Sequence, residues 1–193
     1  MKKIGLTGGI GSGKSIIGKI LSIIGFPVFY SDAIGKMLMT EDQSVVSKVK
    51  ELFGSDAYIK GKLNRTYISE KVFKNPNLKE KLNQIVHPAV RKNFDNWCSQ
   101  QVTPLVFNEA AILFETGSYK NFDALILVTA DEKTRINRVM KRDQVSKQQV
   151  LERINNQWSD DKKKKLADFI ISNDDNDLLV PQVESIVKQL LNQ

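Results

Sequence analysis

The residues with the clearest chemical capacity in this chain lie in one short stretch near its beginning. Residues 8 to 15 read GGIGSGKS, which fits the pattern G-x-x-x-x-G-K-[ST] with Gly8, Gly13, Lys14 and Ser15 in the defined places. Backbone N–H groups of such a loop can surround an anion, because glycine lets the backbone approach it closely. Lysine adds a positive charge, and a serine hydroxyl is a suitable Mg²⁺ ligand. The pattern therefore predicts a site for the phosphates of a nucleotide.

A strand and a helix are expected to hold this loop. Residues 4 to 7 form a short apolar run typical of a buried strand, and isoleucine and leucine then recur at helical spacing from Ile16 to Ile24. A glycine turn that only joined a strand to a helix would not require Lys14 and Ser15 directly after it. We expect the loop to bind ATP, with Mg²⁺ on Ser15, through Gly8, Gly9, Gly11, Ser12, Gly13, Lys14, Ser15 and Ile16.

The composition is typical of one intracellular domain. The chain has 193 residues, of which 41% are hydrophobic, and no apolar run is long enough to span a bilayer. Cys98 is the only cysteine, so a disulfide within the chain is excluded and a reducing compartment is favoured. We expect a cytoplasmic protein without a membrane partner or an obligatory protein partner.

The net charge of +7 allows two kinds of anionic partner. A basic chain can bind nucleic acid or a small polyanionic substrate. The lysines are spread along the chain, aromatic residues do not alternate with basic ones, and no helix-turn-helix or zinc signature is present. We therefore expect no nucleic-acid partner and keep a basic binding module as the less favoured alternative.

Four further apolar runs predict strands, at residues 28–30, 104–108, 124–129 and 169–172. Helical patterns separate most of them, so we predict an α/β fold with a doubly wound, five-stranded parallel sheet. Residues 41 to 96 carry no clear strand. They read as a helical insertion between the second and third strands.

Two acidic residues follow predicted strands. Asp32 comes after the strand at 28–30, and Glu109 directly follows the strand at 104–108. The carboxyl ends of parallel strands are where open α/β sheets bind ligands. Aspartate is also a common helix cap and glutamate a common first-turn residue, so position alone leaves both roles open for each.

His87, the only histidine, precedes Pro88 within a helical stripe from Leu78 to about Trp97. The proline is expected to kink or interrupt the helix there. Such a break can turn a side chain toward a ligand, although a single histidine on a partly apolar face is more often structural.

Two basic helices are predicted at 131–142 and 145–158, followed by a lysine run at 162–165. A mobile segment of this charge could close over phosphates and exclude water. Lysine runs are usually solvated, so we assign the closing role to the arginines and a solvated surface to most of the lysines.

The ordered set of motifs resembles the dephospho-coenzyme A kinase family. The resemblance covers nearly the whole chain and includes LTGGIGSGKS at 6–15, LNQIVHP at 82–88, ILFE at 112–115, Arg142-Asp143, and the segment from Arg153 to Asn173. Three positions depart from the family pattern, namely Tyr30, Ile16 and Glu109-Ala110-Ala111.

The resemblance implies transfer of the ATP γ-phosphoryl group to the ribose 3′-hydroxyl of dephospho-coenzyme A, the last step of coenzyme A synthesis. It also implies an adenylate-kinase-like phosphate-loop core in a single domain over 1–193, a helical substrate subdomain at about 31–98 and a lid at about 140–166. Lys14, Asp32 and Arg142 are then the expected catalytic residues, with Asp32 as base and Lys163 assisting Arg142 over the phosphates. Asp32, His87 and Glu109 are expected to contact the substrate.

The alternative enzyme is another small-molecule or nucleotide kinase of the same fold, which need not carry the histidine-proline helix or ILFE. A GTPase would need Asn-Lys-x-Asp after a strand, and the strand at 124–129 instead continues into Ala130-Asp131-Glu132.

Overall fold

The computed structural model describes residues 1 to 192, apart from the side chain of Pro76. The chain divides into two compact units, one formed by Met1–Tyr30 with Gln101–Gln193 and the other by Ser31–Gln100. Each unit has its own hydrophobic cluster. Among residues 1 to 192, none of the helices combines the length and the apolar composition needed to cross a bilayer.

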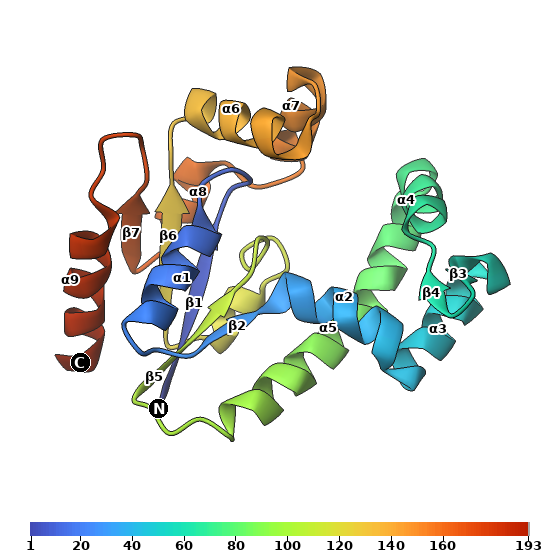
Figure 1. Ribbon diagram of the computed structural model, residues 1–193, viewed down its shortest axis with the longest axis horizontal. Helices are drawn as coiled ribbons and strands as arrows, with labels where there is room; N and C mark the ends of the chain where they lie inside the picture. Colours follow the sequence, from blue (N-terminus) through green and yellow to red (C-terminus); the bar gives the residue numbers. More distant parts are fainter. Residues whose placement is uncertain (193) are drawn as a thin grey trace. The chain divides into compact units, whose positions relative to one another are not determined.

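A five-stranded sheet forms the centre of the first unit, with the strand order β2-β5-β1-β6-β7 (Figure 1). Every neighbouring pair in it is parallel, which confirms the predicted doubly wound sheet. The strands are β1 Lys2–Gly8, β2 Val28–Tyr30, β5 Leu105–Glu109, β6 Ala124–Thr129 and β7 Phe169–Ser172. Strands β5 and β6 are buried along their whole length, as expected of parallel strands with both faces covered.

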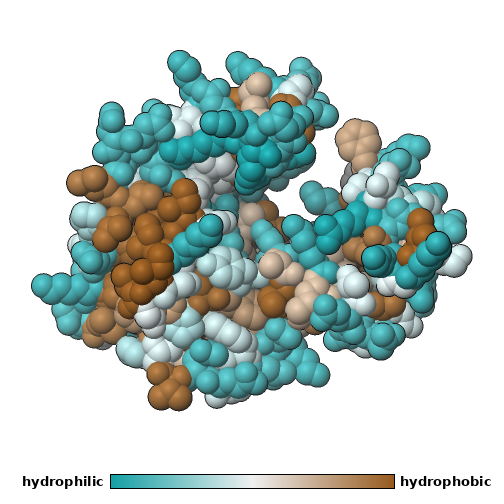
Figure 2. All heavy atoms as spheres, in the orientation of Figure 1, coloured by the Kyte–Doolittle hydropathy of each residue, from teal (hydrophilic) through white to brown (hydrophobic). Residues whose placement is uncertain are grey.

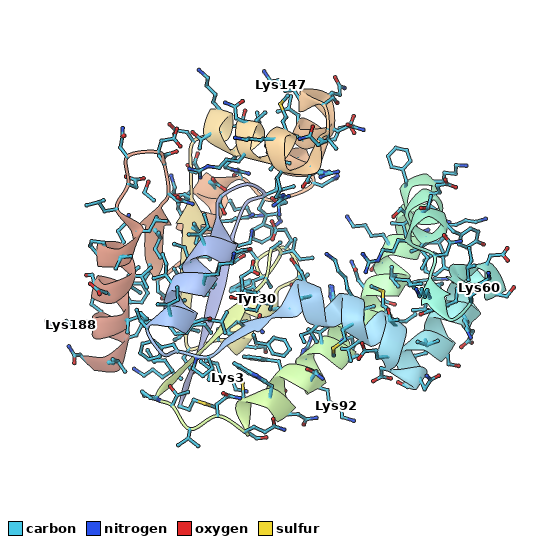
Figure 3. The ribbon with its side chains drawn as sticks, viewed as in Figure 1. Lys3, Tyr30, Lys60, Lys92, Lys147 and Lys188 are labelled. Atoms are coloured by element: carbon cyan, nitrogen blue, oxygen red, sulfur yellow. The ribbon has the colours of Figure 1, made fainter. Side chains whose placement is uncertain are left out.

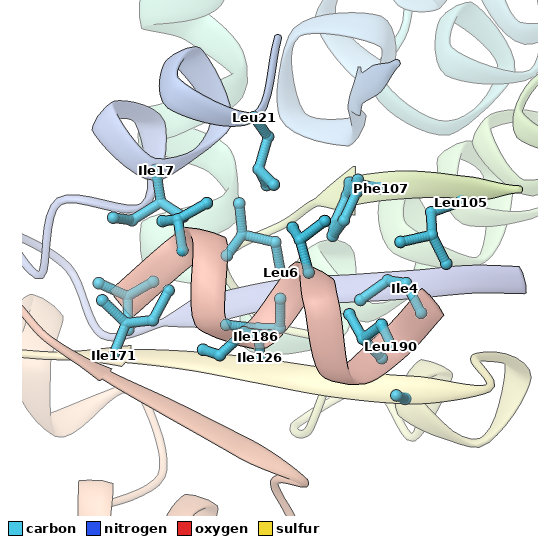
Figure 4. Close-up of a cluster of buried hydrophobic side chains, with 14 residues drawn as sticks. Ile4, Leu6, Ile17, Leu21, Leu105, Phe107, Ile126, Ile171, Ile186 and Leu190 are labelled. Carbon is cyan, nitrogen blue, oxygen red and sulfur yellow. The ribbon is translucent and has the colours of Figure 1, made fainter. Parts of the chain in front are cut away.

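Helices cover this sheet because alternate strand residues face opposite sides. One face packs against α1 and α9 in a cluster that includes Leu6, Phe107, Ile126 and Leu190 (Figure 4). On the other face, Leu125 and Leu127 pack against Leu113 and Phe114 of the segment after β5. The helices of this unit are α1 Lys14–Ile23, α6 Glu132–Asp143, α7 Lys147–Asn155, α8 Asp160–Lys164 and α9 Leu179–Asn192, with the 3₁₀ turn η2 at Ser118–Asn121.

The predictions of α6 and α7 are confirmed to within a few residues at each end. Helix α7 has a capping box, in which the Ser146 side chain and the Gln149 side chain each bond to the backbone of the other residue. Lys147 begins this helix and is labelled in Figure 3. Hydrophilic side chains dominate the surface over α6 and α7 in the view of Figure 2.

The second unit is mainly helical. A cluster that includes Leu38, Val49, Phe53 and Ile68 holds its helices together. Its elements are α2 Ser31–Glu41, α3 Gln43–Phe53, η1 Ser55–Ala57, β3 Tyr58–Ile59, β4 Lys62–Leu63, α4 Arg65–Lys74 and α5 Pro76–Cys98. The expectation that residues 41 to 96 contain no strand is wrong at β3 and β4, which pair antiparallel. Two residues are too few to show the alternation that marks a strand.

Helix α5 continues through Pro88, so the expected interruption at this residue is wrong. Proline removes the N–H that would bond to the carbonyl of residue 84, but the turns on either side remain helical. Leu82, Ile85, Ala89 and Val90 on both sides of the proline pack against the same cluster. This packing holds the helix together across the missing bond.

Candidate active site

The glycine loop joins β1 to α1, as the motif requires. Gly13 is the residue before the first helical turn, with a left-handed φ of 93°, and no side chain caps the helix there. The N–H groups of a first helical turn have no partner within the helix, and the helix dipole favours an anion at this end. The loop and the beginning of α1 together therefore form an anion-binding site.

Two of the loop glycines are required by the protein itself. Gly11 has a φ of 80°, and a side-chain carbon there would lie 2.6 Å from the backbone oxygen of Arg135. A side-chain carbon at Gly13 would overlap the amide group of Asn173. Both positions therefore combine a left-handed backbone with a close neighbour, and neither accepts a larger residue.

Two side chains donate hydrogen bonds to backbone carbonyl groups of the loop. Lys14 Nζ donates to the Gly8 oxygen at 2.9 Å, and Asn173 Nδ2 donates to the Ser12 oxygen at 2.7 Å. Sequence reasoning did not find the role of Asn173. Its position in the sequence could have indicated this role, because Asn173 directly follows β7 and therefore lies at the same edge of the sheet as the loop.

The expected phosphate and metal ligands differ in their exposure. Lys14 is 8% exposed and Ser12 is fully buried, whereas Ser15 and Ile16 are exposed. An accessible hydroxyl next to the lysine fits Mg²⁺, which binds few protein ligands and is otherwise held by phosphates and water. In residues 1 to 192 no group of three or more acidic, histidine or cysteine side chains could hold a metal without the nucleotide.

Glu109 lies in the same unit and at the same edge of the sheet as the loop. It is 7% exposed and lies opposite Leu6 of β1 on one side and Tyr30 of β2 on the other. Tyr30 is labelled in Figure 3. The parallel register thus places a carboxylate on the neighbouring strand level with Leu6, two residues before the glycine loop begins at Gly8.

Asp32 and His87 come together in the second unit. Asp32 lies in the first turn of α2 and is exposed. Gly35 of α2 lets α5 approach, because Val86 and Val90 lie 3.4 and 3.5 Å from where its side-chain carbon would be. Burial lowers the pKa of His87, repulsion from Arg91 lowers it further, and the Asp32 carboxylate opposes both. His87 is therefore neutral at pH 7.

The lowered pKa of His87 predicts a pH dependence of stability. As pH falls below about 6.5, the unfolded chain takes up a proton that the folded chain resists, so the free energy of unfolding decreases. This loss ends below the folded pKa, where both states are protonated. Denaturant titrations at several pH values give the free energy of unfolding, and its dependence on pH should be steeper for wild type than for His87→Gln. Parallel curves for the two proteins would contradict the assignment.

Arg142 lies at the end of α6 with its side chain 63% exposed. Its guanidinium donates two hydrogen bonds to the Asp143 carboxylate, at 2.7 and 3.1 Å, and Arg153 donates a third at 2.7 Å. These partners lower the pKa of Asp143 to about 2. The structure thus pairs the expected catalytic arginine with an acid on the protein surface.

Lys163 is placed differently from the expectation that it assists Arg142. It is fully buried, and its Nζ lies 2.9 Å from Glu115 Oε1 of the ILFE segment. The same Oε1 accepts the Trp158 N–H at 2.9 Å. This lysine therefore connects α8 to the segment after β5, a role that a run of four lysines does not reveal.

Lys163→Met should destabilise the fold by about 3–5 kcal/mol, because the Glu115 carboxylate is left mostly buried without its cation. The neighbouring Lys164 is exposed, and Lys164→Met is the matched control with an expected effect near zero. Adding Glu115→Gln to Lys163→Met should restore part of the loss. Equal unfolding midpoints for the two lysine variants would refute this account of the pair.

Comparison with known proteins places this fold and loop in a family. The family model described as dephospho-CoA kinase matches residues 2–178. The dephospho-CoA kinase of Bacteroides fragilis is 35% identical over 186 residues, covering 96% of this chain and 91% of that protein. That of Porphyromonas gingivalis is 39% identical over 189 residues, covering 97% and 94%.

A solved structure shares this fold. A crystal structure of a Thermus thermophilus protein superposes with a TM-score of 0.85 at 32% identity, covering 99% of this chain and 96% of that one. The chain belongs to the dephospho-CoA kinase family, a family of ATP-dependent kinases that carry out the last step of coenzyme A biosynthesis.

Proposed function

We propose that this protein transfers the γ-phosphoryl group of ATP to the ribose 3′-hydroxyl of dephospho-coenzyme A in the cytoplasm. The observation that carries the proposal is the anion-binding loop at the uncapped start of α1, in a chain of this family. The single cysteine, Cys98, is buried and cannot form a disulfide within the chain, which supports a reducing compartment.

Phosphoryl transfer depends on positioning and on neutralising charge. The N–H groups of the loop and of the first turn of α1 bind the phosphates, and Lys14 adds its positive charge. Ser15 would hold Mg²⁺, which would supply positive charge against the charge that develops on the transferring phosphate. Glu109 acts near the same edge of the sheet, where it orients substrate groups through its carboxylate.

The acceptor hydroxyl needs a base. Asp32 is exposed, follows β2 by two residues in the chain, and faces the neutral His87 within its own unit. We assign Asp32 to accept the hydroxyl proton and His87 to orient Asp32 or the acceptor. Arg142 contributes positive charge to the transferring group when the lid formed by about residues 140 to 166 closes. The helical residues 31 to 98 bind dephospho-coenzyme A.

The direct test is incubation with Mg-ATP and separate acceptors, including dephospho-coenzyme A, shikimate and a set of nucleosides. Formation of ADP together with a product that is one phosphate heavier only with dephospho-coenzyme A is the expected result. Transfer to another alcohol, with none to dephospho-coenzyme A, would replace this proposal with a different kinase of the same fold.

A nucleic-acid-binding function has little structural support. The labelled lysines in Figure 3 come from separate elements, with Lys3 on β1, Lys92 on α5 and Lys188 on α9. The sequence also carries no helix-turn-helix, zinc or RNA-binding signature that would arrange such charges along a nucleic-acid backbone. We therefore propose a small-molecule substrate and neither a nucleic-acid, a membrane nor an obligatory protein partner.

A further inference from the structure

One residue of the phosphate loop is held through its backbone by two side chains from distant parts of the chain. The Ile10 N–H donates to Gln157 Oε1 at 2.8 Å, and the Ile10 carbonyl accepts from Arg135 Nε at 3.0 Å. Ile10 is the middle residue of the glycine-rich turn between Gly9 and Gly11. Both backbone polar groups of Ile10, which belong to the two peptide groups on either side of it, are therefore bonded to residues that lie outside the motif.

Arg135 is itself fixed in place. Its side chain is 7% exposed, and its Nη1 lies 2.9 Å from Asp160 Oδ2 at the beginning of α8. A side-chain carbon at Gly9 would overlap its guanidinium, so a larger residue at this position would displace the arginine. Helix α6 lies beyond the carboxyl end of β6 in Figure 1, where its first turn reaches the loop. Arg135 thus ties the loop to both α6 and α8.

Gln157 reaches Ile10 from the segment between α7 and α8. Its own N–H donates to the Ile154 carbonyl at 2.9 Å, and Trp158, the next residue, donates to Glu115 at 2.9 Å. Its Nε2 lies 3.4 Å from the carbonyl of Ala111, in the segment after β5. The backbone on both sides of Gln157 is therefore anchored, and its carboxamide lies between Ile10 and Ala111.

We propose that Gln157 and Arg135 are positioning residues that hold the Ile10 turn in the shape that binds phosphates. A loop rich in glycine loses much conformational freedom when it orders, and that loss opposes binding unless the loop is already ordered. Fixing the N–H and the carbonyl of Ile10 limits the rotation of the two peptide groups that flank it. This inference rests on the proposed function, since it assigns the two residues a role in binding ATP.

The test compares Gln157→Met with Gln148→Met. Methionine has the length of glutamine but accepts no comparable hydrogen bond, and Gln148 is an exposed residue of the neighbouring α7. By calorimetry, Gln157→Met should weaken ATP and ADP binding about three- to tenfold, which is the effect of one hydrogen bond. Gln148→Met should bind both as wild type does. The KM for dephospho-coenzyme A at saturating ATP should stay unchanged.

A second measurement does not depend on the reaction. Without nucleotide, hydrogen exchange of the Ile10 amide should be faster in Gln157→Met than in Gln148→Met, because the amide has lost its acceptor. Arg135→Lys should also weaken ATP binding. The double variant should lose less than the product of the single effects, because both side chains act on the same residue, Ile10.

Two outcomes would overturn the inference. One is ATP affinity and Ile10 exchange in Gln157→Met equal to those of Gln148→Met, and the other is tighter ATP binding, which would make Gln157 a competitor of the phosphates. The proposed function fails separately, if the wild type binds ATP but does not phosphorylate dephospho-coenzyme A. In that case the binding and exchange data still decide the roles of Gln157 and Arg135.

Discussion

Lys14→Ala should reduce kcat/KM for phosphoryl transfer by at least about 10³-fold and leave the protein folded. Lys14 is 8% exposed, and its Nζ lies 2.9 Å from the oxygen of Gly8, the residue at which β1 ends and the loop begins. In such a sheltered place a positive charge acts on phosphates far more strongly than it would in water. Alanine removes this charge and retains the helix, because it is a strong helix former.

The control for this variant is Lys19→Ala, at an exposed position of the same helix. It removes the same charge from the chain, and its activity should match that of wild type. Circular dichroism and thermal unfolding of both variants separate loss of catalysis from loss of fold. Full activity of a folded Lys14→Ala protein would overturn the assignment of the loop.

Asp32→Asn should lower kcat by about 10²-fold or more while ATP still binds with its wild-type affinity. Asparagine keeps the shape and hydrogen-bonding length of the side chain but cannot accept a proton from the acceptor hydroxyl. ATP affinity should persist because the loop that binds the phosphates lies in the other unit of the chain. Steady-state kinetics together with ATP calorimetry measure the two quantities independently.

The same variant offers a structural readout. Because the Asp32 carboxylate raises the pKa of His87 against burial and Arg91, its removal should shift that pKa further down. His87 is the only histidine, so an NMR titration reports it without overlap. Asp56→Asn, at an exposed position in the same unit, is the matched control for both measurements. Near-normal turnover of Asp32→Asn would remove Asp32 from the role of base.

Local interactions explain why much of this protein could be predicted before its structure was known. The turn from Gly8 to Ser15 is recognisable from residues that follow one another in the chain. The strand at 124–129 is recognisable because it is uncharged, apolar from residue 124 to residue 128, and preceded by Asp123. These features depend on short-range sterics and on burial, which a continuous run of residues records directly.

Long-range packing explains what could not be predicted. Lys163 belongs to a run of lysines, yet it alone is buried against Glu115, because only its side chain faces inward from α8. Helix α5 remains whole at Pro88 because its neighbours pack on both sides of the proline. In both cases the deciding contacts come from residues far away in the chain.

The sequence by itself determined the anion-binding loop, the parallel sheet and the acids at its carboxyl edge, because each is recorded in neighbouring residues. Only the tertiary structure decided which side chains hold that loop. Arg135, Gln157 and Asn173 reach Ile10 and Ser12 from 125, 147 and 161 residues away. Hydrogen bonds between such distant residues leave no periodic trace in the chain, because folding alone brings them within reach.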